Sequence, residues 1–162
     1  MRRLVLNLER CSGCRVCEAI CSLNKEGEFN PVKSRIKVVR TVDELILYKT
    51  PVFCLQCEEP NCMAICPAGA ISEADGGTKI VDERKCIGCK LCEIACPVGA
   101  ITVNPEKHVA IKCNLCAETD DGPQCAKYCY RDALQIIDSE KTGAVLARAK
   151  AGKFLELERK GA

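Results

Sequence analysis

The sequence predicts an α+β fold made of two small modules, the inner one inserted into the outer one, with long connecting loops. Three observations lead to this prediction. The chain of 162 residues contains sixteen cysteines, which fall into four groups of four. Three of the groups run through a similar short turn into an apolar strand, so the sequence is an internal repeat. Aromatic residues make up only 4% of the chain and Trp is absent, so the organic core is thin.

The four groups share nearly the same cysteine spacing. Every group opens C-x2-C and closes C-x3-C, and only the middle spacer varies. The groups are Cys11, Cys14, Cys17 and Cys21; Cys54, Cys57, Cys62 and Cys66; Cys86, Cys89, Cys92 and Cys96; and Cys113, Cys116, Cys125 and Cys129.

The third group, followed by Pro97, has the form C-x2-C-x2-C-x3-C-P. This is the bacterial run that binds a [4Fe-4S] cluster, and its fourth cysteine ligates the other cluster of a pair. Three thiolates on one tight loop can reach three corners of a cubane, whereas the fourth corner faces a partner loop. The sequence therefore predicts four [4Fe-4S] clusters. Because cluster binding contributes to folding, it also predicts a largely unfolded apo chain.

Disulfides and zinc are the two other interpretations of the cysteines. Disulfides suit small secreted domains, but the apolar stretch 4–8 is too short for a signal sequence. Four-cysteine zinc sites also contain C-x2-C pairs, although they seldom add two more cysteines at this spacing. A zinc-bound scaffold or nucleic-acid module remains the alternative from another class. It would favour a basic face and stacking aromatics, whereas opposite charges are interspersed here.

The helices and strands are expected at regular places in the repeat. Short helices should begin at the third cysteine of a group, as at Cys17 and Cys92, and Pro67 and Pro97 should stop them. Alternation and β-branched residues predict strands at 4–8, 35–40, 44–49, 79–82 and 134–138.

The spacing between groups predicts the modules. Groups two and three lie close together and both end in Cys-Pro, so residues 51–103 are expected to form the inner module. Groups one and four then pair in an outer module of residues 1–50 and 104–140. Group one has Ser22 in place of the proline. Residues 141–162 contain no cysteine and form either a docking helix or a solvated tail.

The formal charge of +2 counts every thiol as neutral. Four cubanes with their thiolates would add roughly −8, so the cofactors dominate the charge. Five cations adjoin the cysteines, and they either offset this charge or are ordinary solvated side chains. They are Arg10, Arg15, Lys85, Lys90 and Lys112.

Residues 1–140 resemble the four-cluster, ferredoxin-type electron-transfer subunits of molybdenum and tungsten oxidoreductases. The resemblance rests on the positions of all sixteen cysteines. The resemblance implies two ferredoxin-like modules, in which motifs one and four exchange their last cysteines and motifs two and three do likewise. It therefore implies four sets of iron ligands. These are Cys11, Cys14, Cys17 and Cys129; Cys21, Cys113, Cys116 and Cys125; Cys54, Cys57, Cys62 and Cys96; and Cys66, Cys86, Cys89 and Cys92.

The stretch 21–31, followed by Ser34-Arg35-Ile36, resembles the small subunits of tungsten aldehyde oxidoreductases and carbon monoxide dehydrogenases. The resemblance implies a large molybdenum- or tungsten-containing catalytic subunit as partner, with a flavin subunit, a ferredoxin or further copies of the chain as other candidates. Hydrogenase, formate dehydrogenase and benzoyl-CoA reductase complexes are alternatives. No run approaches the roughly 20 apolar residues that span a membrane, so a cytoplasmic location is expected.

The expected function follows from the ligands. A cubane held by four cysteines passes single electrons but has no open position for a substrate. His108 is the only histidine, and no Ser/His/Asp set, P-loop or dinucleotide motif is present. The sequence therefore predicts a non-catalytic electron-transfer subunit without catalytic residues, and no nucleic-acid partner.

Overall fold

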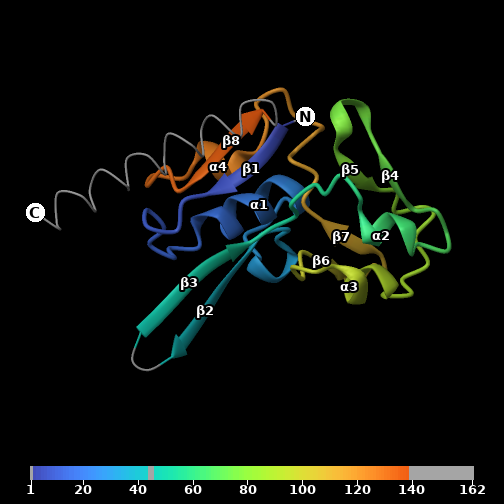
Figure 1. Ribbon diagram of the computed structural model, residues 1–162, viewed down its shortest axis with the longest axis horizontal. Coiled ribbons are helices and arrows are strands. Elements are labelled where there is room, and N and C mark those ends of the chain that lie inside the picture. Colours follow the sequence, from blue (N-terminus) through green and yellow to red (C-terminus); the bar gives the residue numbers. More distant parts are fainter. Residues whose placement is uncertain (1, 44–45, 139–162) are drawn as a thin grey trace, which may run out of the picture.

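The computed structural model of the protein describes residues 2–43 and 46–138 (Figure 1). The expected tail, residues 141–162, lies outside the described residues. Within the described ranges, no helix has both the length and the apolar character needed to cross a membrane.

Short helices and strands follow one another along the chain, so the α+β class is confirmed. The four α-helices of the described ranges are α1 (Val16–Glu26), α2 (Asn61–Ala64), α3 (Leu91–Ala95) and α4 (Gln124–Lys127). The strands are β1 (Arg2–Leu6), β2 (Lys37–Asp43), β3 (Ile46–Val52), β4 (Ile71–Glu73), β5 (Lys79–Val81), β6 (Ile101–Val103), β7 (Ala110–Lys112) and β8 (Leu134–Asp138). Two 3-10 turns lie at Pro31–Lys33 and Asp75–Gly77.

The described strands form four antiparallel sheets of two strands each: β1 with β8, β2 with β3, β4 with β5, and β6 with β7. The first sheet joins the two ends of the described chain, with Leu4 opposite Ile136. In Figure 1, β1 and β8 lie near α1 and α4, while β4–β7 lie with α2 and α3 on the other side. Because a two-stranded sheet is marginal by itself, these sheets depend on the loops packed against them.

Each of these helices begins one residue before the third cysteine of its group. The helices of groups two, three and four have four or five residues, whereas α1 has eleven. Without a proline, α1 continues through Ser22, which is fully buried and donates its hydroxyl to Ala19 O at 2.9 Å. The helix ends at Gly27, whose positive φ of 74° provides a left-handed cap.

Three strand predictions are displaced and one strand was not predicted. The strand expected at 35–40 runs from 37 to 43. The strand expected at 4–8 ends at Leu6, because the Asn7 side chain accepts the N–H groups of Glu9 and Arg10 and starts a turn. The strand expected at 44–49 runs from 46 to 52. The unpredicted strand is β7. Its three residues are too few for an alternating pattern that would distinguish a strand from a loop.

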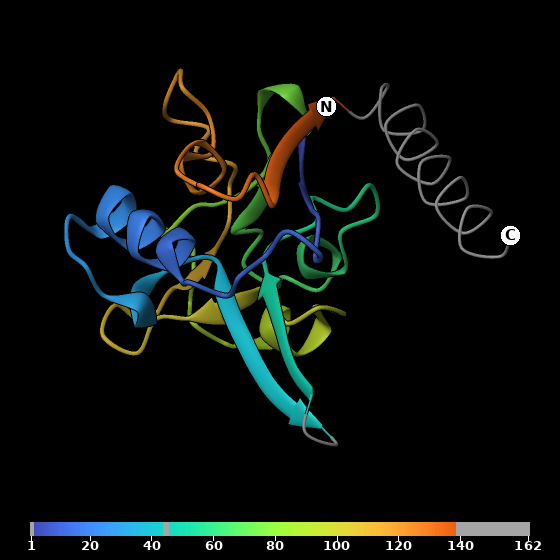
Figure 2. The ribbon, with the colours of Figure 1, turned by 90° about the vertical axis from the view of Figure 1, so that its left-hand side faces the viewer.

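The β2–β3 hairpin projects from the rest of the protein (Figure 2). Its outer residues are exposed, including Val42 and Tyr48 at 68% and 52%. The middle of strand β2 is anchored to the first cysteine loop, because Arg40 Nη2 donates to Gly13 O at 2.5 Å.

Glu18 of α1 forms a second anchor at the base of this hairpin. Its side chain is 1% exposed, and Oε1 accepts the Val38 N–H at 2.6 Å. Oε2 accepts a hydrogen bond from Arg15 Nε at 2.5 Å. The carboxylate therefore ties helix α1 to strand β2.

Replacing Glu18 with Ala is expected to lower the free energy of unfolding of the iron-loaded protein by ~2 kcal/mol, because the buried Val38 N–H loses its acceptor. An anaerobic guanidinium titration followed by circular dichroism measures this. Glu93 has the same position after the third cysteine of its group but is only partly buried, so Glu93→Ala is the matched control. Equal losses in the two variants would contradict the expectation.

Two hydrophobic clusters form the core, and cysteines are part of both. The first contains Leu4, Cys21, Ile36, Phe53, Leu115, Cys125 and Leu134. The second contains Ile71, Cys92, Ile101 and Ala110. Helix α1 contacts α4, and α2 contacts α3, so the helices of groups one and four pack together, as do those of groups two and three.

Candidate iron–sulfur sites

The four cysteine loops share a backbone feature at one position. The residue before the second cysteine has a positive φ in each loop, although only two of these residues are glycines. They are Gly13 (69°), Gln56 (52°), Gly88 (68°) and Leu115 (55°). At Gly88, a Cβ would lie 2.4 Å from His108 O, so only glycine fits there. The internal repeat is therefore a repeat of loop conformation as well as of cysteine spacing.

The last sulfur of each group accepts a backbone N–H. In groups two, three and four the donor is the alanine four residues later, and each distance is 3.3 Å. These pairs are Ala70 to Cys66, Ala100 to Cys96 and Ala133 to Cys129. In group one, the Arg35 N–H donates to Cys21 Sγ at 3.4 Å. Such donors stabilise negative charge on sulfur. The turn that follows groups two, three and four therefore prepares the last cysteine as a ligand, whereas in group one a more distant segment does so.

Three cavities are each lined by four cysteines from two groups. The sets are Cys11, Cys14, Cys17 and Cys129; Cys21, Cys113, Cys116 and Cys125; and Cys66, Cys86, Cys89 and Cys92. Across the described residues, no three Cys, His, Asp or Glu side chains are placed to hold a single metal ion.

The remaining four cysteines, Cys54, Cys57, Cys62 and Cys96, line none of these three cavities. Burial raises the pKa of the Cys62 thiol; nearby Lys112 opposes this, and the neighbouring Cys54 and Cys96 add to it. Cys62 is therefore close to one cysteine of its own group and one of the next. Cys57 is partly buried on the same loop as Cys54.

Burial has a large effect on several of the thiols. It raises the pKa of Cys17 and Cys113 to about 12 and that of Cys92 to about 11, and it also raises the pKa of Cys125. Reactive cysteines show the opposite shift. A thiol of this kind loses its proton at neutral pH only when a nearby positive charge, such as a bound metal, stabilises the thiolate.

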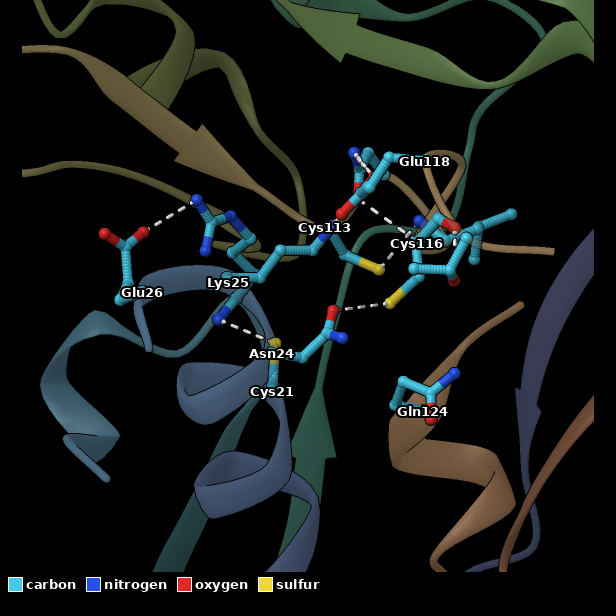
Figure 3. Close-up of polar contacts among 12 residues, drawn as sticks. Cys21, Asn24, Lys25, Glu26, Cys113, Cys116, Glu118 and Gln124 are labelled. Carbon is cyan, nitrogen blue, oxygen red and sulfur yellow. Dashed lines mark hydrogen bonds and ion pairs between the residues drawn. The ribbon is translucent and has the colours of Figure 1, made fainter. Parts of the chain in front are cut away.

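Figure 3 shows the surroundings of Cys21, Cys113 and Cys116. Lys25 and Arg35 line the same cavity, and their side chains are only 7% and 11% exposed. Lys25 is paired with Glu118, and Arg35 Nη2 lies 2.8 Å from a Glu26 carboxylate oxygen. Burial lowers the pKa of Lys25, and the nearby Cys116 opposes this shift. Buried cations therefore adjoin this cysteine set.

Two polar residues at the sites are buried. Lys112 is one of the five cations that the sequence placed next to cysteines, whereas Gln56 was not singled out. Gln56 is 0% exposed and Lys112 is 4% exposed. The other four cations next to cysteines, Arg10, Arg15, Lys85 and Lys90, are exposed. A signal for Lys112 was its place between Ile111 of an apolar run and Cys113.

Comparison with known proteins identifies the family. Residues 45–139 match the 4Fe-4S dicluster domain. An uncharacterized ferredoxin of Methanocaldococcus jannaschii is 41% identical, with 98% of this chain and 94% of that protein covered. Electron transport protein HydN of Escherichia coli is 34% identical over 86% of this chain and 90% of that protein. The polyferredoxin-like subunit of the aliphatic sulfonate oxidoreductase of Pyrococcus furiosus is 35% identical, with 83% and 76% covered.

A solved structure shares the fold. It is the active site complex BamBC of benzoyl coenzyme A reductase, solved in complex with zinc, with a TM-score of 0.50 and 24% identity over 100% of this chain and 93% of that chain. The prediction of [4Fe-4S] cofactors is confirmed, and the zinc alternative is set aside. The chain belongs to the family of 4Fe-4S ferredoxin-type electron-transfer proteins, with sixteen cysteines that fit four [4Fe-4S] clusters.

Proposed function

We propose that this protein is the electron-transfer subunit of an oxidoreductase complex and passes single electrons between a large molybdenum- or tungsten-containing catalytic subunit and a redox partner. The observation that carries the proposal is the set of cysteine-lined cavities in one small chain. When bound, [4Fe-4S] clusters with four cysteine ligands supply one-electron transfer without a site for substrate. The protein's own role is to hold the clusters in series and to set their surroundings.

The proposed ligand sets pair the groups crosswise. Groups one and four supply Cys11, Cys14, Cys17 with Cys129, and Cys21 with Cys113, Cys116, Cys125. Groups two and three supply Cys54, Cys57, Cys62 with Cys96, and Cys66 with Cys86, Cys89, Cys92. The cysteine membership of the three cavities supports this arrangement, and so do the helix contacts of α1 with α4 and α2 with α3.

The proposed modules follow the same pairing. The inner module is residues 51–103, and the outer module is residues 1–50 and 104–140. The two hydrophobic clusters support this division. All members of the first cluster but Phe53 lie in the outer module, and all members of the second but Ala110 lie in the inner module. Phe53 and Ala110 each join one module to the core of the other.

A tungsten aldehyde oxidoreductase is the favoured partner. The support is the resemblance of the stretch 21–31, followed by Ser34-Arg35-Ile36, to the small subunits of such enzymes. The relative from Pyrococcus furiosus, named as a subunit of an aliphatic sulfonate oxidoreductase, also supports a role as a subunit. Carbon monoxide dehydrogenase, hydrogenase, formate dehydrogenase and benzoyl-CoA reductase complexes are the alternatives.

Anaerobic purification from the native host tests the proposal. Iron, sulfide and zinc are counted per chain, and every copurifying subunit is identified. We expect about sixteen iron and about sixteen sulfide, as four cubanes require, together with a large tungsten or molybdenum subunit. If a catalytic subunit of another class copurifies instead, the tungsten aldehyde oxidoreductase is rejected as partner and that class takes its place. A chain without any large subunit, or one with about four zinc and no sulfide, would contradict the proposal.

A further inference from the structure

Lys112, the last residue of β7, has its ammonium group in the protein interior. Its Nζ donates to Lys79 O at 2.5 Å and to Cys113 O at 3.0 Å, and it lies 3.5 Å from Cys54 Sγ. A lysine ammonium has three donors. Two carbonyl oxygens and one cysteine sulfur therefore account for all of its hydrogen bonds.

This buried charge has no carboxylate partner among the ion pairs of the described residues. Burying a charge is costly unless it is paired and hydrogen-bonded. The two carbonyls satisfy the hydrogen bonds but carry no net charge. The group within reach that would supply negative charge is Cys54 as a ligand, together with the cluster that it would hold. The cluster is thus the counter-ion that the position of Lys112 requires.

Lys112 also lies at a junction between two of the proposed ligand sets. Cys54 belongs to one set, and the adjacent residue Cys113 belongs to another. The buried Gln56 side chain bridges the same place, donating to Cys113 O at 2.8 Å and accepting the Lys79 N–H at 2.8 Å. Lys112 and Gln56 therefore hold the same two backbone segments, which fixes the ammonium beside Cys54.

We propose that Lys112 is a positioning residue that raises the reduction potential of the cluster held by Cys54, Cys57, Cys62 and Cys96. This inference rests on the proposed ligand sets. A reduced cluster carries one more negative charge than an oxidised one, so a fixed positive charge favours the reduced state. The four exposed cations next to cysteines are in contact with water, which weakens any similar effect. The buried lysine thus makes this cluster a better electron acceptor than the same cluster would be without the charge of Lys112.

The test is a redox titration of Lys112→Met, followed by electron paramagnetic resonance. We expect iron content to stay at the wild-type value. At a fixed solution potential, the ratio of reduced to oxidised protein should fall at least about tenfold for one cluster, which is ~59 mV for one electron. The other three clusters should change less. A Cys62→Ser variant identifies the signal of the affected site by altering or removing it.

Lys85→Met is the matched control, because Lys85 also directly precedes the first cysteine of its group but is exposed. Unchanged potentials in fully loaded Lys112→Met, or an equal shift in Lys85→Met, would overturn the inference. If Lys112→Met loses iron, Lys112→Gln removes the charge while keeping amide donors, and the same fall is expected. If the Met and Gln variants both lose iron, Lys112→Arg is expected to keep the iron and the wild-type potential, because it keeps the charge. Loss of iron or a changed potential in Lys112→Arg would overturn the role of charge. A wild-type protein without four clusters would instead reject the proposed function.

Discussion

Removing the iron from the protein is expected to unfold most of the chain. Each sheet in the described part of the chain has only two strands, and three of the four helices have five residues or fewer. Elements of this size are not stable alone. The second hydrophobic cluster contains only four buried residues, and Cys92 is one of them. Because the clusters bind the folded chain, their binding energy becomes folding energy.

The measurement is anaerobic chelation of iron, with far-ultraviolet circular dichroism and one-dimensional proton NMR recorded as iron is lost. We expect the dispersed amide signals to collapse and the guanidinium transition of the apo chain to lose its cooperativity. Reconstitution with iron and sulfide is the control, because recovery of the native spectrum excludes chemical damage. An apo chain that keeps a cooperative transition would show that the apolar core is sufficient by itself.

The cysteine repeat made much of the architecture predictable. Spacing and the turn residues placed the helices at the third cysteines, and Pro67 and Pro97 indicated that the helices of groups two and three would be short. The departure at Ser22 marked the group whose helix is longer, although a missing proline alone did not predict how far α1 would extend. The signals that worked were local, because cysteine spacing and proline act within a few residues.

The features that could not be predicted depend on contacts between distant segments. Charged and amide side chains are usually solvated, so nothing local distinguishes buried Glu18 and Gln56 from their exposed counterparts. Gln56 keeps a left-handed backbone at a position where two other groups have glycine. Its two hydrogen bonds reach residues 23 and 57 positions away in sequence, which offsets the cost of that conformation.

Replacing Cys21 with Ser is expected to alter the cluster of group four rather than the cluster of its own group. Cys21 follows Cys17 by one turn of α1, so a purely local arrangement would place both on the same cluster. In the structure, however, Cys21 lines a cavity with Cys113, Cys116 and Cys125. Serine is a poorer ligand for iron than cysteine thiolate, so this cluster should be lost or shifted.

The signals lost in a set of single variants decide between the two arrangements. Cys21→Ser should remove the same electron paramagnetic resonance signal as Cys113→Ser and should leave the signal that depends on Cys14. The second module provides an independent test of the same rule, since Cys96→Ser should match Cys57→Ser and not Cys89→Ser. If Cys21→Ser matched Cys14→Ser instead, the crosswise pairing would be wrong. Each loop would then hold its own cluster, and the contacts of α1 with α4 would serve packing alone.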